Sequence, residues 1–221
     1  MTGSPSHQHT DHAHSAGKVP WTAAEWDERY AGTAQMFSGR PNFALVTEVS
    51  GLQPGRALDV GCGEGADAVW LAGRGWKVTA LDVSQVALER AASHARQAAV
   101  QVEWVHAGLL DAVLPPAGFD LVSAQYPALR SSADHDAERA LLAAVAPGGL
   151  LLVVYHAGFD GEVARARGID PADYVGLTDV TSLLGDDWQV HIDEDRLRDV
   201  PAGGPEHQHT HDVVLRARRL G

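Results

Sequence analysis

Short apolar runs alternate with helical patterns through the middle of the chain. Five runs are nearly continuous in Val, Leu and Ala and are expected to be buried strands, at Arg56–Val60, Lys77–Leu81, Val102–His106, Asp120–Gln125 and Leu150–Tyr155. The segments between them carry apolar residues at helical spacing, which predicts helices near Ala66–Arg74, Gln85–Ala98 and Ala137–Val145. This alternation predicts an α/β fold with a mostly parallel sheet and helices on both faces.

The pattern changes in the last third of the chain. Thr178 is expected to cap a short helix that runs through Leu184. Two further strands are predicted at Trp188–Asp193 and His211–Ala217, with no helix between them. Adjacent strands without a crossover helix predict an antiparallel hairpin at one edge of the sheet.

The beginning of the chain is polar and rich in histidine. Residues 1–17 have no hydrophobic periodicity, so they are predicted to form a flexible arm. Residues 18–221 are predicted to form a single domain, in which residues 18–50 supply short aromatic cap helices. A chain of 221 residues with 45% hydrophobic content can bury one substantial core.

The most specific chemistry lies between the first two predicted strands. Leu58-Asp59-Val60-Gly61-Cys62-Gly63-Glu64-Gly65 leads from a strand through a glycine turn into a helix. Glycines let backbone N–H groups approach a ligand, and the positive end of the helix dipole faces the same place. Asp82 ends the second strand, where a carboxylate can accept hydrogen bonds from ribose hydroxyls. Together these features predict a nucleotide-type cofactor site.

Composition narrows the classes of partner. The formal net charge of -12 argues against a nucleic-acid partner, because neutralising phosphates requires clustered Lys and Arg. One basic cluster, Arg216, Arg218 and Arg219, is expected on the outer face of the final strand. The single cysteine, Cys62, excludes an intramolecular disulfide and fits a reducing compartment. No apolar run approaches the ~20 residues that span a bilayer, so a cytoplasmic protein without a membrane partner is expected.

These motifs resemble the class I S-adenosylmethionine-dependent methyltransferases. The similarity covers roughly residues 21–219 and also rests on Phe119-Asp120-Leu121-Val122 and Pro147-Gly148-Gly149. Three segments are similar to the small tellurite-resistance and thiopurine-type methyltransferases, namely Trp26-Asp27-Glu28-Arg29-Tyr30, Gly39-Arg40-Pro41-Asn42 and Ala57–Leu71. The resemblance implies a Rossmann-like seven-stranded sheet in the order 3-2-1-4-5-7-6, with strand 7 antiparallel.

The resemblance also implies S-adenosylmethionine as the cofactor, bound over the carboxyl ends of the first two strands. Asp59 would orient its ammonium group, Asp82 would bind the ribose hydroxyls, and the turn glycines would pass beneath the methionyl part. The family often contacts the adenine amine with an acidic residue, which Gly108 replaces here, so backbone groups or the nearby Asp111 would take that role. The predicted cofactor-binding residues are Arg40, Asn42, Asp59, Gly61, Cys62, Gly63, Gly65, Asp82, Val83, Gly108, Leu109 and Gln125.

The implied reaction is methyl transfer to a small molecule: a thiol, a metalloid oxyanion or a small natural product. In-line displacement is accelerated largely by positioning, so a general base is optional. Tyr126 and His156 follow the fourth and fifth strands on the expected acceptor side and are the candidate catalytic residues. The ordinary pKa of an imidazole is suitable for proton transfer near neutral pH. Neither the acceptor nor the oligomeric state is indicated by the sequence.

Histidine clusters suggest a separate metal hypothesis. His207, His209 and His211 alternate, so a strand would place all three on one face, and a second cluster comprises His7, His9, His12 and His14. Imidazoles spaced in this way can ligate Zn, Ni or Cu. The alternative interpretation is a solvated arm and an exposed strand end.

Two other functions compete with methyl transfer. Gly61-x-Gly63-x-x-Ala66 with Asp82 downstream also satisfies a relaxed fingerprint for an NAD(P)-dependent oxidoreductase. Asp59 argues against that function, because a carboxylate before the turn suits an ammonium better than a pyrophosphate. The second alternative is a noncatalytic metal- or cofactor-binding protein on the same scaffold.

Overall fold

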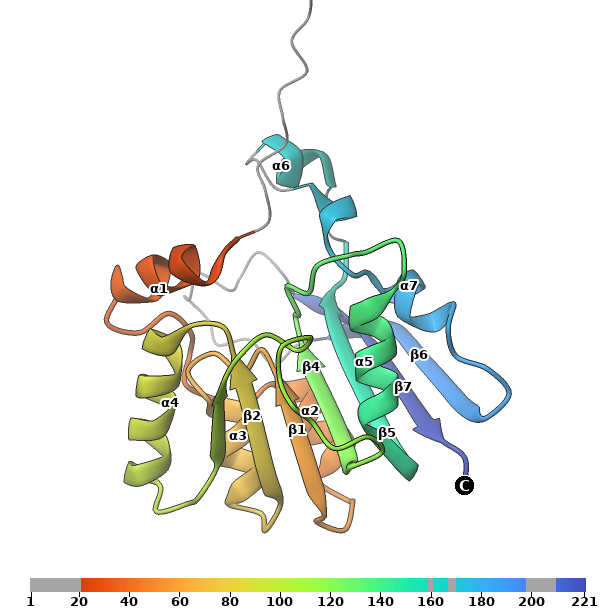
Figure 1. Ribbon diagram of the computed structural model, residues 1–221, viewed down its shortest axis with the longest axis horizontal. Helices are drawn as coiled ribbons and strands as arrows, with labels where there is room; N and C mark the ends of the chain where they lie inside the picture. Colours follow the sequence, from red (N-terminus) through yellow and green to blue (C-terminus); the bar gives the residue numbers. More distant parts are fainter. Residues whose placement is uncertain (1–20, 159–160, 167–169, 198–209) are drawn as a thin grey trace, which may run out of the picture.

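A seven-stranded sheet forms the centre of the computed structural model (Figure 1), which describes residues 21–158, 161–166, 170–197 and 210–221. Its strands are β1 (Arg56–Val60), β2 (Lys77–Asp82), β3 (Glu103–His106), β4 (Phe119–Gln125), β5 (Val145–His156), β6 (Trp188–Leu197) and β7 (His211–Arg219). They lie in the order β3-β2-β1-β4-β5-β7-β6, and β7 pairs antiparallel with both of its neighbours. The predicted sheet order and terminal hairpin are confirmed.

Helices cover both faces of the sheet. They are α1 (Ala23–Ala31), α2 (Phe43–Val49), α3 (Ala66–Ala72), α4 (Gln85–Gln97), α5 (Asp136–Ala144), α6 (Gly161–Ala166), the 3-10 helix η1 (Pro171–Asp173) and α7 (Leu177–Thr181). The predicted cap of α4 is confirmed, because the Ser84 hydroxyl accepts the Ala87 N–H at 3.1 Å. No helix within the described ranges is long and apolar enough to cross a bilayer.

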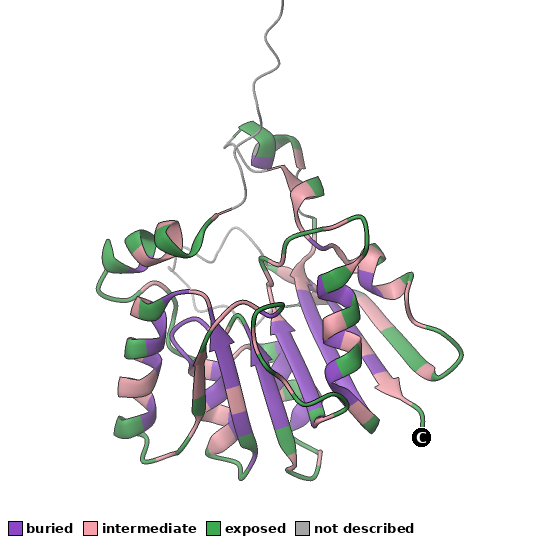
Figure 2. Cartoon of the chain, viewed as in Figure 1, coloured by how far each residue is buried: buried purple, intermediate pink, exposed green. Residues whose placement is uncertain are grey.

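Strand alternation divides the interior into two cores. Successive side chains of a strand point to opposite faces. Leu58 and Val60 pack in one cluster with α5 and α7, whereas Ala57 packs in the other with α2 and α3. We call these the α5 face and the α2 face of the sheet. The central strands are buried along most of their length (Figure 2).

Several element boundaries differ from the prediction. β5 begins at Val145 and includes Pro147-Gly148-Gly149, because Val145 pairs with Phe119 before a register shift in β4. α7 begins after Gly176, whose N–H donates to Asp179 Oδ2 at 2.7 Å, so Thr178 lies inside the helix. β6 continues to Leu197 through an irregularity in its pairing with β7.

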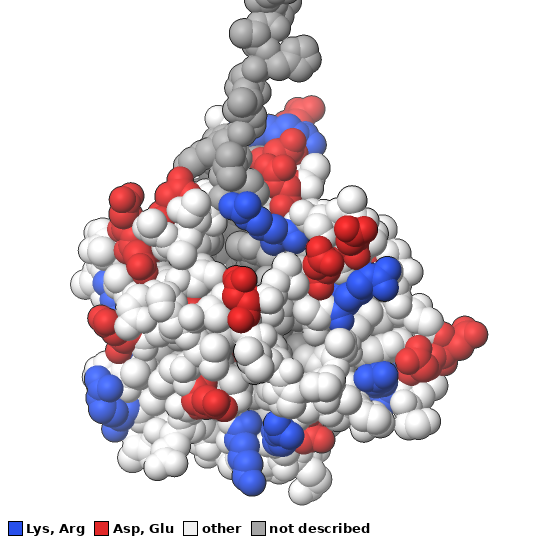
Figure 3. All heavy atoms as spheres, in the orientation of Figure 1, with Lys and Arg blue, Asp and Glu red and all other residues white. Residues whose placement is uncertain are grey.

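The arginines of the last strand contact other groups of this protein, so they do not form a free basic face. Arg216 Nε lies 3.2 Å from Glu48 Oε2. The guanidinium groups of Arg218 and Arg219 donate to the carbonyl oxygens of Gly148 and Val145, each at 2.8 Å. On the face of the molecule in Figure 3, acidic and basic side chains are interspersed.

Candidate functional site

A cavity of about 840 Å³ opens at the carboxyl ends of the central strands. Every residue predicted to bind the cofactor or to act in catalysis lines it: Arg40, Asn42, Asp59, Gly61, Cys62, Gly63, Gly65, Asp82, Val83, Gly108, Leu109, Gln125, Tyr126 and His156. The fold therefore brings the predicted set together at one place, as expected where an open parallel sheet ends. The role of each residue stays a prediction.

The glycine turn creates space at the floor of this cavity. Gly61, Gly63 and Gly65 all have positive φ angles, of 71°, 51° and 80°, a region that favours glycine. A Cβ atom added at Gly61 would meet nothing within 4 Å. At Gly65 it would lie 2.6 Å from the Ala91 Cβ, so this glycine lets the turn pack closely against α4.

The backbone N–H groups of the turn are bonded to the protein itself. The bonds run from Gly61 and Cys62 to the Leu81 carbonyl (2.9 and 3.0 Å), from Gly63 to Asp82 Oδ2 (2.8 Å) and from Gly65 to the Cys62 carbonyl (2.9 Å). The prediction that these N–H groups approach a ligand is therefore wrong. The turn offers room to a ligand, and its donors stabilise the turn.

Asp82 has a structural contact on each carboxylate oxygen. Its Oδ2 accepts the Gly63 N–H, and its Oδ1 accepts the Ser84 N–H at 2.8 Å. Burial raises the pKa of Asp82, and these N–H groups act in the opposite direction. Because each oxygen can accept a second bond, the carboxylate can hold the turn and also receive hydroxyl donors from the cavity.

Asp59 differs from the other acids of the turn. Its Oδ2 is buried and has no hydrogen-bond partner among the described residues. Burial raises its pKa well above the ordinary value, and the charges of Asp67 and Asp82 raise it further. The Ala68 backbone N–H acts in the opposite direction, but Oδ2 still lacks a donor, and a ligand ammonium group would supply a donor and a positive charge there. The site thus fits the methionyl end of S-adenosylmethionine.

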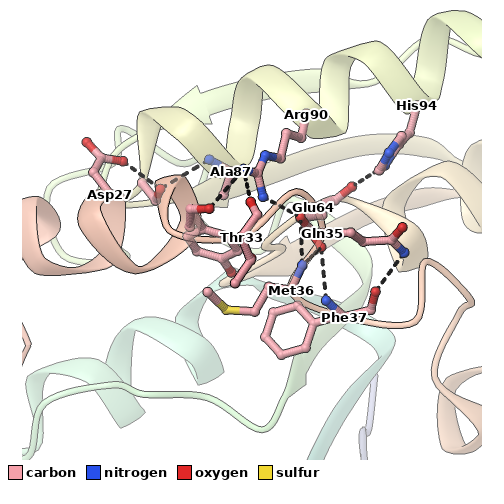
Figure 4. Close-up of polar contacts among 11 residues, drawn as sticks. Asp27, Thr33, Gln35, Met36, Phe37, Glu64, Ala87, Arg90 and His94 are labelled. Carbon is pink, nitrogen blue, oxygen red and sulfur yellow. Dashed lines mark hydrogen bonds and ion pairs between the residues drawn. The ribbon is translucent and has the colours of Figure 1, made fainter. Parts of the chain in front are cut away.

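Glu64 attaches the loop between α1 and α2, residues 32–42, to the glycine turn (Figure 4). Its buried carboxylate accepts the backbone N–H groups of Met36 and Phe37, each at 3.1 Å from Oε2. Phe37 also lines the cavity. The same side chain therefore connects the floor of the cavity to its N-terminal wall.

Arg90 of α4 completes this attachment. Its Nη1 lies 2.9 Å from Glu64 Oε1, and its Nη2 donates to the carbonyl oxygens of Tyr30 and Thr33 at 2.8 and 2.6 Å. In addition, Asp27 of α1 accepts the Ser84 hydroxyl at 2.6 Å. Helix α1 and the loop that follows it are therefore both attached to the glycine turn and to α4.

Asn42 fixes the far end of the same loop. Its backbone N–H and its side-chain amide donate to the two carboxylate oxygens of Asp67, at 2.7 and 2.8 Å. Asp67 lies in the first turn of α3. The predicted ligand contact of Asn42 therefore coexists with a structural role that the sequence did not indicate.

Tyr126 and His156 line the cavity and belong to a polar cluster with Asp212, which lies behind them. The rings of Tyr126 and His156 are stacked, with centroids 4.2 Å apart and planes 20° apart. The Tyr126 hydroxyl donates to Asp212 Oδ2 at 2.8 Å, and His156 Nδ1 lies 3.7 Å from Asp212 Oδ1. Asp212 was not predicted. Its one available signal was a carboxylate directly before the apolar run of the last strand.

The metal hypothesis is not supported by the part of the chain that the structure covers. His207, His209 and the histidines of the N-terminal arm lie outside the described residues. His211 Nε2 lies 3.9 Å from Asp195 Oδ1. Among the described residues, no three His, Cys, Asp or Glu side chains are grouped to hold a metal. A Zn, Ni or Cu site stays a prediction.

The middle of the chain is similar to known methyltransferase sequences. Residues 57–149 match the family described as methyltransferase domain. An uncharacterized methyltransferase of Mycobacterium tuberculosis is 41% identical over 97 residues, which are 44% of this chain and 48% of that protein. The ubiquinone biosynthesis O-methyltransferase of Alkalilimnicola ehrlichii is 34% identical over 95 residues, covering 42% of this chain and 38% of that protein. The matches thus span less than half the length of these curated relatives.

Solved structures extend the likeness to the whole fold. A protein studied for the conversion of a disulfide bond into a thioacetal group during echinomycin biosynthesis has a TM-score of 0.68 at 24% identity, over 90% of this chain and 92% of its own. An S-adenosylmethionine-dependent methyltransferase from Mesorhizobium loti has a TM-score of 0.59 at 19% identity, over 80% and 96%. The narrower resemblance to tellurite-resistance and thiopurine-type enzymes stays a prediction. The chain therefore shares its fold with a solved S-adenosylmethionine-dependent methyltransferase, and its residues 57–149 match the methyltransferase domain family.

Proposed function

We propose that this protein transfers a methyl group from S-adenosylmethionine to a small organic molecule. The observation that carries the proposal is the buried Asp59 Oδ2, which has no partner among the described residues and lies beside a glycine turn with room for a ligand. A zwitterionic ligand with an ammonium group satisfies this carboxyl group.

The predicted cofactor-binding residues each bind a different part of the ligand. Asp59 binds the ammonium group, and the open side of Gly61 accommodates the methionyl chain. Asp82 accepts the ribose hydroxyls, and Gly108 and Leu109 lie against the base. When bound, the cofactor supplies a methyl group attached to a sulfonium. The acceptor attacks the methyl carbon in line with the carbon–sulfur bond, and the sulfide is the leaving group.

The polar groups around the turn disfavour a nicotinamide dinucleotide. A pyrophosphate is normally bound by free backbone N–H groups at a glycine turn and helix N-terminus. Here those of Gly61, Cys62 and Gly63 are already bonded within the protein. The buried carboxyl groups of Asp59 and Asp82 would also lie beside a diphosphate, which offers them no cation. These contacts favour the methyltransferase over the oxidoreductase.

The lining of the cavity favours an organic acceptor over an inorganic oxyanion. Phe37 and Phe43 line the cavity and are 51% and 44% exposed, so they offer apolar surface to a ligand. Trp26 and Tyr126 add aromatic walls. Among the proposed acceptor classes, a small natural product or an organic thiol fits this lining better than a metalloid oxyanion does.

Calorimetry followed by transfer of a labelled methyl group tests the proposal. S-adenosylhomocysteine is expected to bind and NADH is not, and Asp82→Asn should weaken S-adenosylhomocysteine binding. Labelled cofactor is then offered with thiol, phenol, amine, selenite and tellurite acceptors. Absence of S-adenosylhomocysteine binding contradicts the proposed cofactor. Binding without transfer to any acceptor favours the noncatalytic alternative.

A further inference from the structure

Three polar side chains from neighbouring strands converge on one face of the sheet. Tyr126 directly follows β4, His156 ends β5, and Asp212 is the second residue of β7. These strands are adjacent in the sheet, and His156 and Asp212 are paired across β5 and β7. Their neighbours Val154 and Val214 belong to the core of the α2 face, so alternation puts His156 and Asp212 on that face too.

The contacts within this group resemble those of a positioned base. Asp212 is 2% exposed and receives the Tyr126 hydroxyl on Oδ2 at 2.8 Å. Its Oδ1 lies 3.7 Å from His156 Nδ1, a separation that catalytic pairs often show before a substrate is bound. Tyr126 and His156 line the cavity, whereas Asp212 lies behind them. An imidazole whose Nδ1 faces a carboxylate has Nε2 as its other proton-accepting atom.

The local backbone supports a function for this group. Tyr126 has a φ angle of 50°, in the left-handed region that non-glycine residues rarely adopt. Its N–H is held by the Val154 carbonyl at 2.8 Å, which fixes the turn after β4 and aims the ring at His156. Strain of this kind persists where the surrounding structure enforces it, and it is concentrated at functional sites.

We propose that His156 is the general base of the methyl transfer, that Asp212 and Tyr126 position it, and that the acceptor atom is therefore the oxygen of a neutral hydroxyl group. This inference rests on the proposed function and deepens it by naming the acceptor chemistry. A thiol is already ionised to a few per cent near neutral pH and its thiolate is a strong nucleophile, whereas an alcohol or an ordinary phenol is ionised far less. An imidazole that a buried carboxylate orients can remove the proton from an acceptor that must lose one during methyl transfer.

The proton and electron pairs balance in one step. The acceptor oxygen forms a bond to the methyl carbon with a lone pair, and the carbon–sulfur bond of the donor breaks with its electrons remaining on sulfur. The hydroxyl proton passes to His156 Nε2. Asp212 stabilises the imidazolium that results, and Tyr126 holds the carboxylate in place.

A pair of phenols of different acidity tests the base. His156→Gln and Asp212→Asn should lower kcat for 4-ethylphenol, which is neutral near pH 7, by about 100-fold with little change in KM. For 4-nitrophenol, which ionises readily, the loss should be at least tenfold smaller. Tyr155→Phe is the matched control, because Tyr155 neighbours His156 on β5 but packs on the α5 face. This variant should keep wild-type rates with both phenols.

Nitrogen NMR supplies a readout that does not depend on turnover. Asp212 should hold the His156 proton on Nδ1, and Asp212→Asn should shift the ring toward the Nε2–H tautomer. An unchanged tautomer overturns the inference, as does an equal loss with both phenols or methyl transfer confined to thiols or amines. In each of these cases S-adenosylhomocysteine still binds, so the proposed function stands. Loss of that binding in the wild-type protein would instead contradict the proposed function.

Discussion

The buried carboxyl group of Asp59 lowers the stability of the ligand-free fold. A buried carboxyl group with a raised pKa and an unpartnered oxygen destabilises the native state relative to a neutral side chain of the same shape. Asp67 is as deeply buried in the protein but receives two N–H donors from Asn42. The two acids, eight positions apart, should therefore respond differently to the same substitution.

Asp59→Asn should stabilise the protein and weaken its cofactor binding. Removing the buried charge should raise the thermal midpoint by about 2–4 °C, equivalent to about 1 kcal/mol. Losing the contact to the ligand ammonium should weaken S-adenosylhomocysteine binding by about 10- to 100-fold. Differential scanning calorimetry and titration calorimetry measure the two effects. Asp67→Asn is the control and should lower the midpoint, because its amide can no longer accept both Asn42 donors. A fall in the midpoint of Asp59→Asn would contradict the assignment.

The sequence indicated which residues gather at the site, but it did not indicate the contacts between them. Asp59, the glycines and Asp82 occur in a short sequence pattern, and all of them line the cavity. The contacts of Glu64 and Arg90 join positions 26 residues apart, and Asp212 contacts a tyrosine 86 residues away. A single sequence carries no signal for such pairs, because hydrophobic periodicity reports burial and not partners.

At the scale of elements, the loop of residues 32–42 supplies part of the cavity wall and is attached to α4 through Arg90. Arg90 bonds to Glu64 of the glycine turn and to two carbonyl groups near the end of α1. The glycine turn and this part of the wall are therefore held by the same side chain. Loosening it should affect ligand binding although Arg90 itself does not line the cavity.

Arg90→Ala should free this loop from α4. We expect a loss of about 1–3 kcal/mol in the free energy of unfolding, because two carbonyl groups and a buried carboxylate lose a charged donor. Chymotrypsin should cleave after the exposed Phe37 faster than in the wild type, and S-adenosylhomocysteine should reduce the difference. Arg96→Ala, on an exposed position of the same helix, is the control. Equal cleavage rates in the two variants would show that Arg90 does not hold the loop.

Elements with strong periodicity were predicted well, and irregular ones were not. The strands of the parallel sheet and helix α4 match their predicted ranges to within one or two residues, apart from the early start of β5. Helices α6 and η1 were missed because their short segments have no hydrophobic repeat. The extension of β6 to Leu197 was missed because its last residues are charged and are paired only through the edge hairpin.

At the scale of the whole molecule, the buried acids link stability to pH. Burial raises the pKa values of Asp59, Asp67 and Asp82, so the native state retains protons that the unfolded chain has released. Their contribution to the free energy of unfolding therefore falls as pH rises from the ordinary carboxyl range, near about 4, through the raised values. Urea denaturation between pH 4.5 and 7.5 should show the stability advantage of Asp59→Asn over wild type growing with pH. An advantage that is constant or shrinks with pH would contradict this linkage.

Cofactor binding should release protons for the same reason. The ligand ammonium lowers the pKa of Asp59 from its raised value in the free protein, so affinity should increase with pH across that interval. Calorimetric titrations with S-adenosylhomocysteine in buffers of different ionisation enthalpy measure the number released. Asp59→Asn should release fewer protons than the wild type. If the wild type and Asp59→Asn released the same number of protons, those protons would come from groups other than Asp59.

The sheet order was predictable because strand alternation, the terminal hairpin and the family resemblance agreed. The position of the cavity wall supplied by the loop of residues 32–42 was not predictable, because it depends on hydrogen bonds of a loop without hydrophobic periodicity. The same limit applies to the polar cluster of Tyr126, His156 and Asp212, which exists only because β7 lies between β5 and β6. Chemistry that depends on strands distant in sequence becomes visible once the topology is known.

The loop of residues 32–42 is held chiefly through main-chain N–H groups, those of Met36, Phe37 and Asn42. Any residue other than proline presents such a donor, so the side chains at positions 36 and 37 can change without undocking the loop. The attachment of the loop and the shape of the cavity wall can therefore vary independently. Under the proposed function, substitutions at these two positions would change which acceptor molecules fit the cavity and leave the docking of the loop intact.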